Sequence, residues 1–166
     1  MSLYAVLQAN GLLGIGVPEE AESIFDEIAE TLLNETILRV GGRPYRLVEI
    51  EFYANGSTHP DPFAHCDEMQ LRTAHWYFHR TGEEYRGGSF KGLDITFAPE
   101  GYYGGILIRT IEGWVPEGQE EVFVSGPSLS VDHILAGCGA GSVVELVEKM
   151  GNRSVVREDA DRLLWL

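Results

Sequence analysis

The segment from Arg46 to Tyr53 constrains the fold of this chain more than any other. Its sequence, RLVEIEFY, alternates apolar with acidic or aromatic residues, which is the period of a β-strand with one buried face. The alternation predicts two faces: Val48, Ile50 and Phe52 on the core, and Leu47, Glu49, Glu51 and Tyr53 on the open side. Two carboxylates and a phenol on one rigid strand face make a candidate catalytic surface. A half-solvated strand without function is the alternative interpretation.

The segments around this strand predict an α+β domain with an antiparallel sheet. Pro18 followed by acidic residues is typical of a helix start, and apolar residues then recur at helical spacing to about Leu33. Gly41 and Gly42 predict a hairpin turn between a strand at 35–40 and its return strand from Tyr45. Further strands are expected within 85–97, 103–111 and 121–124, and helices at 67–79, 127–135 and 142–150.

No pattern of parallel crossovers is present, so an open-barrel-like antiparallel core flanked by helices is the expected architecture. The whole chain, 1–166, is expected to form a single domain. Within it, residues 1–17 are interpreted as an N-terminal extension. Residues 137–166 are interpreted as a C-terminal tail packed on the body, because the last four residues are apolar.

Composition limits the partners of this protein. The net charge of −14 over 166 residues repels phosphate backbones on average. Five of the twelve basic residues nevertheless fall between positions 72 and 109: Arg72, Arg80, Arg86, Lys91 and Arg109. No apolar stretch reaches the length of about 18 residues that spans a membrane. No membrane contact and no cofactor are expected, and a cytoplasmic location is the default.

Histidine and cysteine residues are concentrated in one part of the chain: His59, His65, Cys66, His75 and His79. On the expected helix, His75 and His79 would share a face, and with His65, Cys66 or Asp67 they could bind zinc. Their spacing matches no established zinc motif, and packed or surface histidines are the simpler interpretation.

Several short motifs follow one another in a characteristic order. They are Arg46 to Tyr53, Ala64-His65, Tyr77-Phe78 with Gly82, Leu107-Ile108-Arg109-Thr110-Ile111-Glu112, and Ser125-Gly126-Pro127-Ser128 before a helix. In this order the chain resembles the alkyladenine (methylpurine) DNA glycosylase family, whose members have an antiparallel, barrel-like core. The resemblance covers about residues 20 to 136.

The resemblance implies a hydrolase that releases a modified purine from DNA or from a smaller nucleoside. It implies that Glu51 is the general base for the attacking water and that Arg109 holds the water and the carboxylate. It further implies base contacts by Tyr53 and His65. Glu49, Ser125 and Gly126 would support the site, the last two at a DNA-backbone contact. Tyr85 and Phe90 are the nearest counterparts of a second stacking ring and of the wedge that enters the duplex.

The chain also departs from this family. Arg86-Gly87 stands where the family has the rest of a Tyr-x-Tyr motif, and Leu129 replaces a lysine. With the acidic net charge, these differences disfavour duplex DNA. Two alternatives therefore stay open: a non-catalytic module that binds a small base-like ligand on the same fold, and a metal-dependent hydrolase using the histidine and cysteine cluster.

Overall fold

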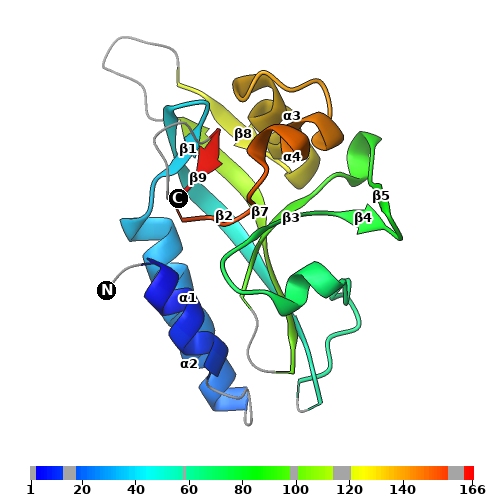
Figure 1. Cartoon of the computed structure of the whole chain (residues 1–166). Helices are drawn as coiled ribbons and strands as arrows, with labels where there is room; N and C mark the ends of the chain where they lie inside the picture. The colour runs from blue at the N-terminus through cyan, green and yellow to red at the C-terminus, as the bar shows by residue number, and fades with distance from the viewer. Residues whose placement is uncertain (1–2, 13–17, 58, 98–100, 114–120, 157–162) are drawn as a thin grey trace.

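A curled antiparallel sheet forms the centre of the domain in the computed structural model of the chain, which describes residues 3–12, 18–57, 59–97, 101–113, 121–156 and 163–166 (Figure 1). Its strands run in the order β3-β6-β7-β2-β1-β9, and β8 pairs with β7. Their bounds are β1 Leu38–Val40, β2 Arg43–Asn55, β3 Trp76–Phe78, β6 Leu93–Thr96, β7 Tyr103–Gly113, β8 Phe123–Ser125 and β9 Leu164–Trp165. A separate hairpin consists of β4 Arg80–Thr81 and β5 Glu84–Tyr85. The expected single α+β domain with an open antiparallel sheet is confirmed.

The helices lie in two groups on this sheet. At one side are α1 Leu3–Leu12 and α2 Pro18–Glu30, and α2 continues as a π-helical turn, Thr31–Glu35. In the second group, α3 Pro127–Gly137 and α4 Val143–Met150 lie near β8 (Figure 1). Pro18, Pro127 and the Ser142 cap begin helices where the sequence predicts them. The helix α1 falls inside the expected extension; the sequence LYAVLQANGL carries apolar residues all around the helix and gives no amphipathic signal.

The two glycines of the predicted hairpin turn join β1 to β2. Gly41 has φ 55° and Gly42 has φ 82°, so both adopt the left-handed conformation that a tight two-residue hairpin requires. Val40 pairs with Arg43 across the turn. At the far edge of β1, the C-terminal tail adds β9, which pairs Arg39 with Trp165. This strand was not predicted from the sequence.

The strand β2 contains a bulge that changes the predicted faces. Its register against β7 shifts between Leu47 and Glu49 and again between Glu49 and Ile50. The prediction that Leu47 shares the open face is wrong, since Leu47 is 1% exposed and belongs to the core. The prediction that Val48 packs on the core is also wrong, because Val48 is 37% exposed. An extra residue at a bulge reverses the alternation, so Leu47 lies on the core with Ile50 and Phe52.

The predicted helix at 67–79 is wrong. Asp67 caps only a short 3-10 helix, Glu68–Leu71, through a capping box with Gln70. Ala74 then takes a positive φ of 59°, which ends any helix, and the chain continues as β3. Because strand side chains alternate, Trp76 and Phe78 enter the main core, and the Tyr77 and His79 rings lie 5.7 Å apart on the other side.

The core between the sheet and the helices is rich in aromatic rings. Phe25 of α2 stacks on Phe52 of β2 with ring centroids 4.8 Å apart, and Phe97 meets both rings edge-on at 5.7 Å. The fully buried Trp76 donates its indole N–H to the carbonyl of Leu164 in β9. This core fixes the face of β2 that bears Glu51. Among the described helices, none has the length and apolar character needed to cross a membrane.

Candidate functional site

Glu51 is held between two side chains of the central strands. Arg109 of β7 donates from Nη1 to Glu51 Oε1 at 2.6 Å, and the Tyr53 hydroxyl donates to Glu51 Oε2 at 2.7 Å. Burial and the carboxylate of Glu51 raise the pKa of Tyr53 to about 12, so its hydroxyl stays a donor at neutral pH. The side chains of Glu51 and Arg109 are 36% and 35% exposed. The carboxylate is therefore fixed in orientation and still open to water.

Glu49 supports this arrangement from the neighbouring position. It accepts a 2.9 Å hydrogen bond from Thr110 Oγ1, and its Oε1 lies 3.6 Å from Arg109 Nε. That separation is an ion pair and too long for a hydrogen bond. Glu49 and Glu51 together therefore neutralise Arg109 and limit the rotamers of its guanidinium group.

The segment that begins α3 holds the backbone at Arg109. The Gly126 N–H donates to the Arg109 carbonyl at 2.8 Å, and Ser130 Oγ donates to the same carbonyl at 3.3 Å. Ser125 Oγ lies 3.4 Å from Thr110 Oγ1 and can donate to it, since the Thr110 proton goes to Glu49. The Gly126 amide, predicted as a contact to a DNA backbone, is thus engaged inside the protein.

A pocket of about 190 Å³ adjoins the Glu51 cluster. Tyr53 connects the two, since its ring lines the pocket and its hydroxyl binds Glu51. The other lining residues come from the loop after β2, the 3-10 helix, the segment after β3, and strands β6 and β7: Phe63, His65, Gln70, His79, Asp94 and Leu107. The pocket therefore combines two aromatic rings and one apolar side chain with a polar wall.

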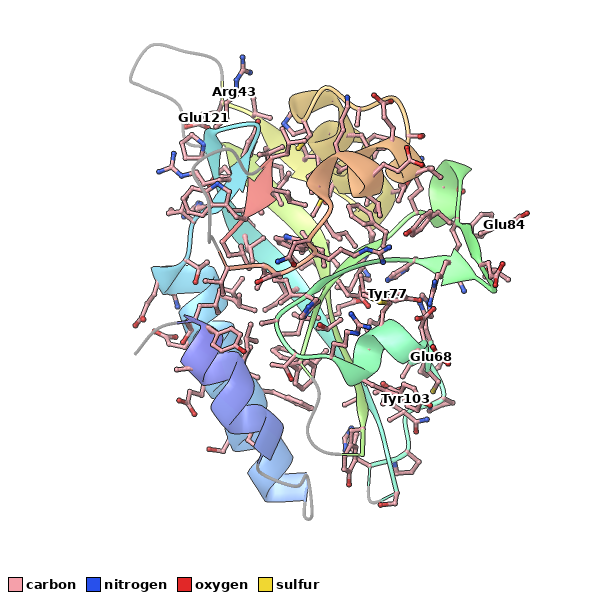
Figure 2. All side chains as sticks on the ribbon, viewed as in Figure 1. Arg43, Glu68, Tyr77, Glu84, Tyr103 and Glu121 are labelled. Carbon is pink, nitrogen blue, oxygen red and sulfur yellow. The ribbon has the colours of Figure 1, made fainter. Side chains whose placement is uncertain are left out.

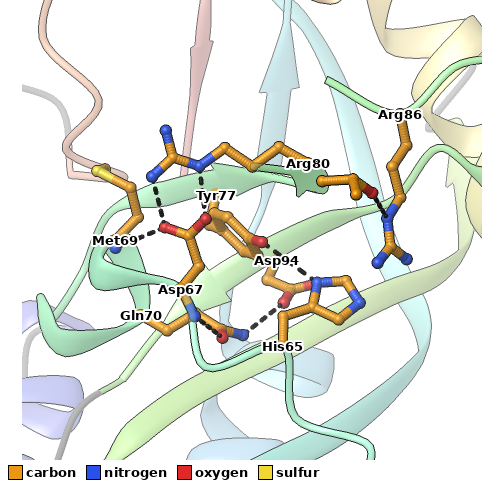
Figure 3. A network of polar contacts seen from close by, with 9 residues as sticks. His65, Asp67, Met69, Gln70, Tyr77, Arg80, Arg86 and Asp94 are labelled. Carbon is orange, nitrogen blue, oxygen red and sulfur yellow. Dashed lines mark hydrogen bonds and ion pairs between the residues drawn. The ribbon is translucent and has the colours of Figure 1, made fainter. Parts of the chain in front are cut away.

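The polar wall of the pocket is one connected network, and Figure 3 shows its His65, Gln70 and Asp94 side chains. His65 Nδ1 lies 3.2 Å from the Tyr77 hydroxyl, and the His65 and His79 rings meet edge-on with centroids 4.2 Å apart. His79 Nε2 lies 2.6 Å from Asp94 Oδ1. Figure 2 shows Tyr77 pointing into the interior of the molecule, whereas Glu84 projects from its surface. Burial raises the pKa of Tyr77 above its usual range, so this hydroxyl is neutral.

Burial, together with the neighbouring charges of His79 and Arg86, lowers the pKa of His65 to about 4. His65 is therefore a neutral imidazole at physiological pH. A neutral ring can accept as well as donate a hydrogen bond, which suits contact with an uncharged base.

Ion pairs neutralise part of the basic segment near the pocket. Arg80 donates two hydrogen bonds to Asp67, at 2.5 and 2.7 Å, and Lys91 lies 3.1 Å from Asp132. Burial acts to raise the pKa of Asp67, but hydrogen bonds from Arg80 and the Met69 amide outweigh it and lower that pKa. Arg86 binds Thr81 Oγ1 and faces the His65 side of the network (Figure 3). Arg80 and Lys91 are thus paired with carboxylates, whereas the charge of Arg86 stays close enough to His65 to lower its pKa.

The residues suggested for a metal site do not converge. His75 Nδ1 binds the carbonyl of Thr73, and Cys66 Sγ accepts a hydrogen bond from Asn55. Within the part of the chain that the structure describes, no group of three or more histidine, cysteine or acidic residues is arranged to hold a metal ion. The metal-dependent hydrolase loses its geometric basis, because the shared helix face that motivated it does not exist.

Two predicted ligand contacts lie outside the pocket lining. Tyr85 belongs to the β4–β5 hairpin, where it pairs with Arg80. Phe90 ends a short 3-10 helix and is 76% exposed. By contrast, Tyr53 and His65 both line the pocket.

Sequence reasoning missed four lining residues: Phe63, Gln70, Asp94 and Leu107. The charge of Asp94 inside the apolar run LDITF is one local signal, since a carboxylate in a buried strand requires partners. The glycine pair at 104–105 is a second signal, because glycine in a strand often marks close approach of another group.

No protein-family model matches this chain, and no solved structure matches it. Among curated proteins, the chain is similar to "Uncharacterized protein L759" of Acanthamoeba polyphaga mimivirus, with 39% identity over 128 residues. The match covers 69% of this chain and 57% of the viral protein, so the chain spans little more than half of that relative's length.

The buried His65 predicts a loss of stability in mild acid. The unfolded chain binds a proton at His65 below about pH 6.5, whereas the folded chain binds it only near pH 4, so unfolding takes up protons in this window. Stability should fall as pH decreases from 6.5 to 4. We expect His65→Gln to reduce this loss between pH 7.5 and 5 by on the order of 1 kcal/mol, since solvent partly screens a half-buried ring.

Urea unfolding of both proteins at the two pH values measures this difference. His133→Gln is the control for histidine number, because burial also lowers the pKa of His133, which lies far from the pocket against Tyr45. An acid-induced loss in His65→Gln equal to that of the wild type would contradict the assignment.

Proposed function

We propose that this protein is a purine N-glycosidase in which Glu51 activates the water that releases a modified purine base. The observation that supports this proposal most strongly is the placement of Glu51 beside a base-sized pocket. Tyr53 lines the pocket and also binds Glu51, so a nucleoside whose base stacks on Tyr53 would have its glycosidic bond close to the Glu51 carboxylate. Glu51 remains 36% exposed, which leaves it access to water.

The size and lining of the pocket favour a single ring system. Its volume of about 190 Å³ is below the roughly 300 Å³ at which pockets for drug-sized ligands begin. A purine base would fill it and leave the sugar outside. Tyr53 and Phe63 supply aromatic surfaces for stacking, and Leu107 supplies an apolar contact.

The reaction needs a base and a source of negative charge, and Glu51 can supply both. Cleavage of the C1′–N9 bond leaves its electron pair on the purine, and the sugar becomes oxocarbenium-like. The carboxylate stabilises that cation and takes a proton from water as the water oxygen bonds to C1′. The departing purine takes up a proton. Arg109 and Tyr53 act as positioning residues by fixing both oxygens of Glu51.

The motif order supports the same proposal. The positions that resemble the base, the arginine, the stacking ring and the base-contacting histidine of alkyladenine DNA glycosylases are Glu51, Arg109, Tyr53 and His65. On this proposal the sheet is a divergent form of that family's fold. The charge of −14 and the paired state of Arg80 and Lys91 favour a nucleoside over duplex DNA as the substrate.

The test is direct measurement of base release. Wild-type protein is incubated with inosine, ethenoadenosine and 7-methylguanosine, and with single- and double-stranded DNA containing hypoxanthine or ethenoadenine. Free base is then measured by chromatography. We expect release from at least one nucleoside, slowed at least about 100-fold in Glu51→Gln. The proposal fails if no substrate releases base above the level of the Glu51→Gln protein.

A second candidate is a non-catalytic module that binds a base-like ligand in the same pocket. It is favoured by the hydrogen bonds that engage both oxygens of Glu51, since these compete with an attacking water. Calorimetric binding of a nucleoside without turnover, at equal affinity in wild type and Glu51→Gln, would support this candidate over the enzyme.

A further inference from the structure

Asp94 is the most deeply buried carboxylate at the pocket, and the strands around it leave it space. It lies in β6 with 2% of its surface exposed and lines the pocket. In β7, Leu107 pairs with Asp94 and Gly105 pairs with Thr96. An added Cβ at Gly105 would nevertheless lie 2.4 Å from Asp94 Oδ2 and 2.7 Å from Gln70 Nε2. A side chain at position 105 would therefore displace the carboxylate, and only glycine lets Asp94 lie over this strand.

Two neighbours fix the orientation of this carboxylate and leave part of its capacity unused. His79 Nε2 lies 2.6 Å from Oδ1, and Gln70 Nε2 donates to Oδ2 at 3.4 Å. Gln70 is itself held, because its Oε1 accepts the Asp67 N–H at 3.2 Å. An ionised carboxylate has about four acceptor positions. Among the described residues, His79 and Gln70 take one position on each Asp94 oxygen, which leaves one position on each for a further donor.

We infer that Asp94 selects the substrate by accepting two parallel N–H donors, so that the pocket prefers a guanine-type base. The inference rests on the proposed function for its ligand class and names the substrate within that class. A guanine presents N1–H and an exocyclic N2–H side by side on one edge, which matches the two oxygens of one carboxylate. Hypoxanthine presents N1–H alone, and adenine presents an acceptor at N1.

The rest of the pocket is compatible with this orientation. Tyr53 and Phe63 can contact the ring faces, and the neutral His65 can meet a ring acceptor or donor outside the Asp94 edge. A buried carboxylate that faces an acceptor edge would lose hydration without gaining a partner, which penalises adenine-type rings. Selection then comes from repulsion of the wrong edge as well as from attraction of the right one.

Binding by the Glu51→Gln protein tests this inference apart from catalysis. Guanosine and inosine differ by the exocyclic amino group alone, and calorimetry measures both affinities. We expect guanosine to bind about 10- to 100-fold more tightly, as one additional hydrogen bond to a charged group allows. Replacing Asp94 with asparagine in this background should reduce the ratio to within about threefold, because the amide offers one acceptor oxygen.

Matched variants keep the result interpretable. Glu49→Gln removes a carboxylate outside the pocket lining and should preserve the guanosine preference. Gly105→Ala keeps the Asp94 charge but displaces it, and should reduce the preference even if the asparagine variant fails to fold. Equal affinity for guanosine and inosine in the Glu51→Gln protein would overturn the inference, as would a preference that survives both Asp94→Asn and Gly105→Ala.

The outcomes separate the two proposals. Base release without guanosine preference would support the N-glycosidase proposal and contradict the proposed role of Asp94. Guanosine preference without base release from any nucleoside would support the role of Asp94 and identify a binding module instead of an enzyme.

Discussion

Under the proposed N-glycosidase activity, the Glu51→Gln protein is expected to release base from a nucleoside about 100- to 10,000-fold more slowly than the wild type, the range typical for loss of a general base. The amide cannot take a proton from water and carries no negative charge to stabilise an oxocarbenium-like sugar. The substitution keeps the size of the side chain. Its oxygen can still accept from Arg109 or Tyr53, so the fold should persist.

Single-turnover measurement of base release, with protein in excess, checks this expectation because it reports the chemical step. Glu49→Gln is the matched control, since it removes the neighbouring carboxylate, which contacts Thr110 and Arg109 and not the pocket. We expect Glu49→Gln to slow release less than about tenfold, as a positioning residue would. Equal losses in the two variants would show that Glu51 is not the distinct base.

Replacing Gly41 with alanine should destabilise the domain by at least about 3 kcal/mol. Gly41 has φ 55°, a conformation that costs other residues roughly 1–2 kcal/mol. An added Cβ would also lie 2.0 Å from the backbone carbonyl oxygen of Gly137 at the end of α3. A backbone atom cannot move aside as a side chain can, so the hairpin and α3 would have to separate.

Gly42→Ala is the matched control because it shares the turn. Gly42 has φ 82°, but an added Cβ would meet no atom within 4 Å. We expect Gly42→Ala to cost about 1–2 kcal/mol, from conformational strain alone. Urea unfolding of the two variants beside the wild type measures both values. Equal costs would mean that the close approach of α3 contributes nothing.

The parts of this protein that sequence predicted are those set by short-range chemistry. Pro18 and Pro127 begin helices because proline fixes φ and has no N–H that would need a partner in the first turn. Ser142 caps α4 by accepting a hydrogen bond from the Glu145 amide. Gly41 and Gly42 form a turn because no other residue adopts positive φ as readily. The shared face of Glu49, Glu51 and Tyr53 follows from strand alternation, and Arg109 joins them through the pairing of β2 with β7.

Predictions for longer segments were wrong where tertiary contacts overrode a local sequence pattern. The stretch from Asp67 to His79 has no strand alternation, because both faces of β3 are buried. Its sequence pattern therefore predicted a helix. Pairing of Trp76 with Ile95 of β6 converts it into a strand of the sheet. In β2, the bulge beside Glu49 reverses the faces of Leu47 and Val48, and no residue in that run signals it.

The sequence by itself determined the central strand, its carboxylates and the turns and caps that frame it, since these depend on neighbours a few residues away. Only the tertiary structure decided which side chains meet there. Asp94, His79 and Gln70 reach the pocket through the pairing of β3, β6 and β7, and the space for Asp94 comes from Gly105 in β7. Such contacts depend on the register and packing of strands that are distant in sequence, and a local sequence pattern does not predict them.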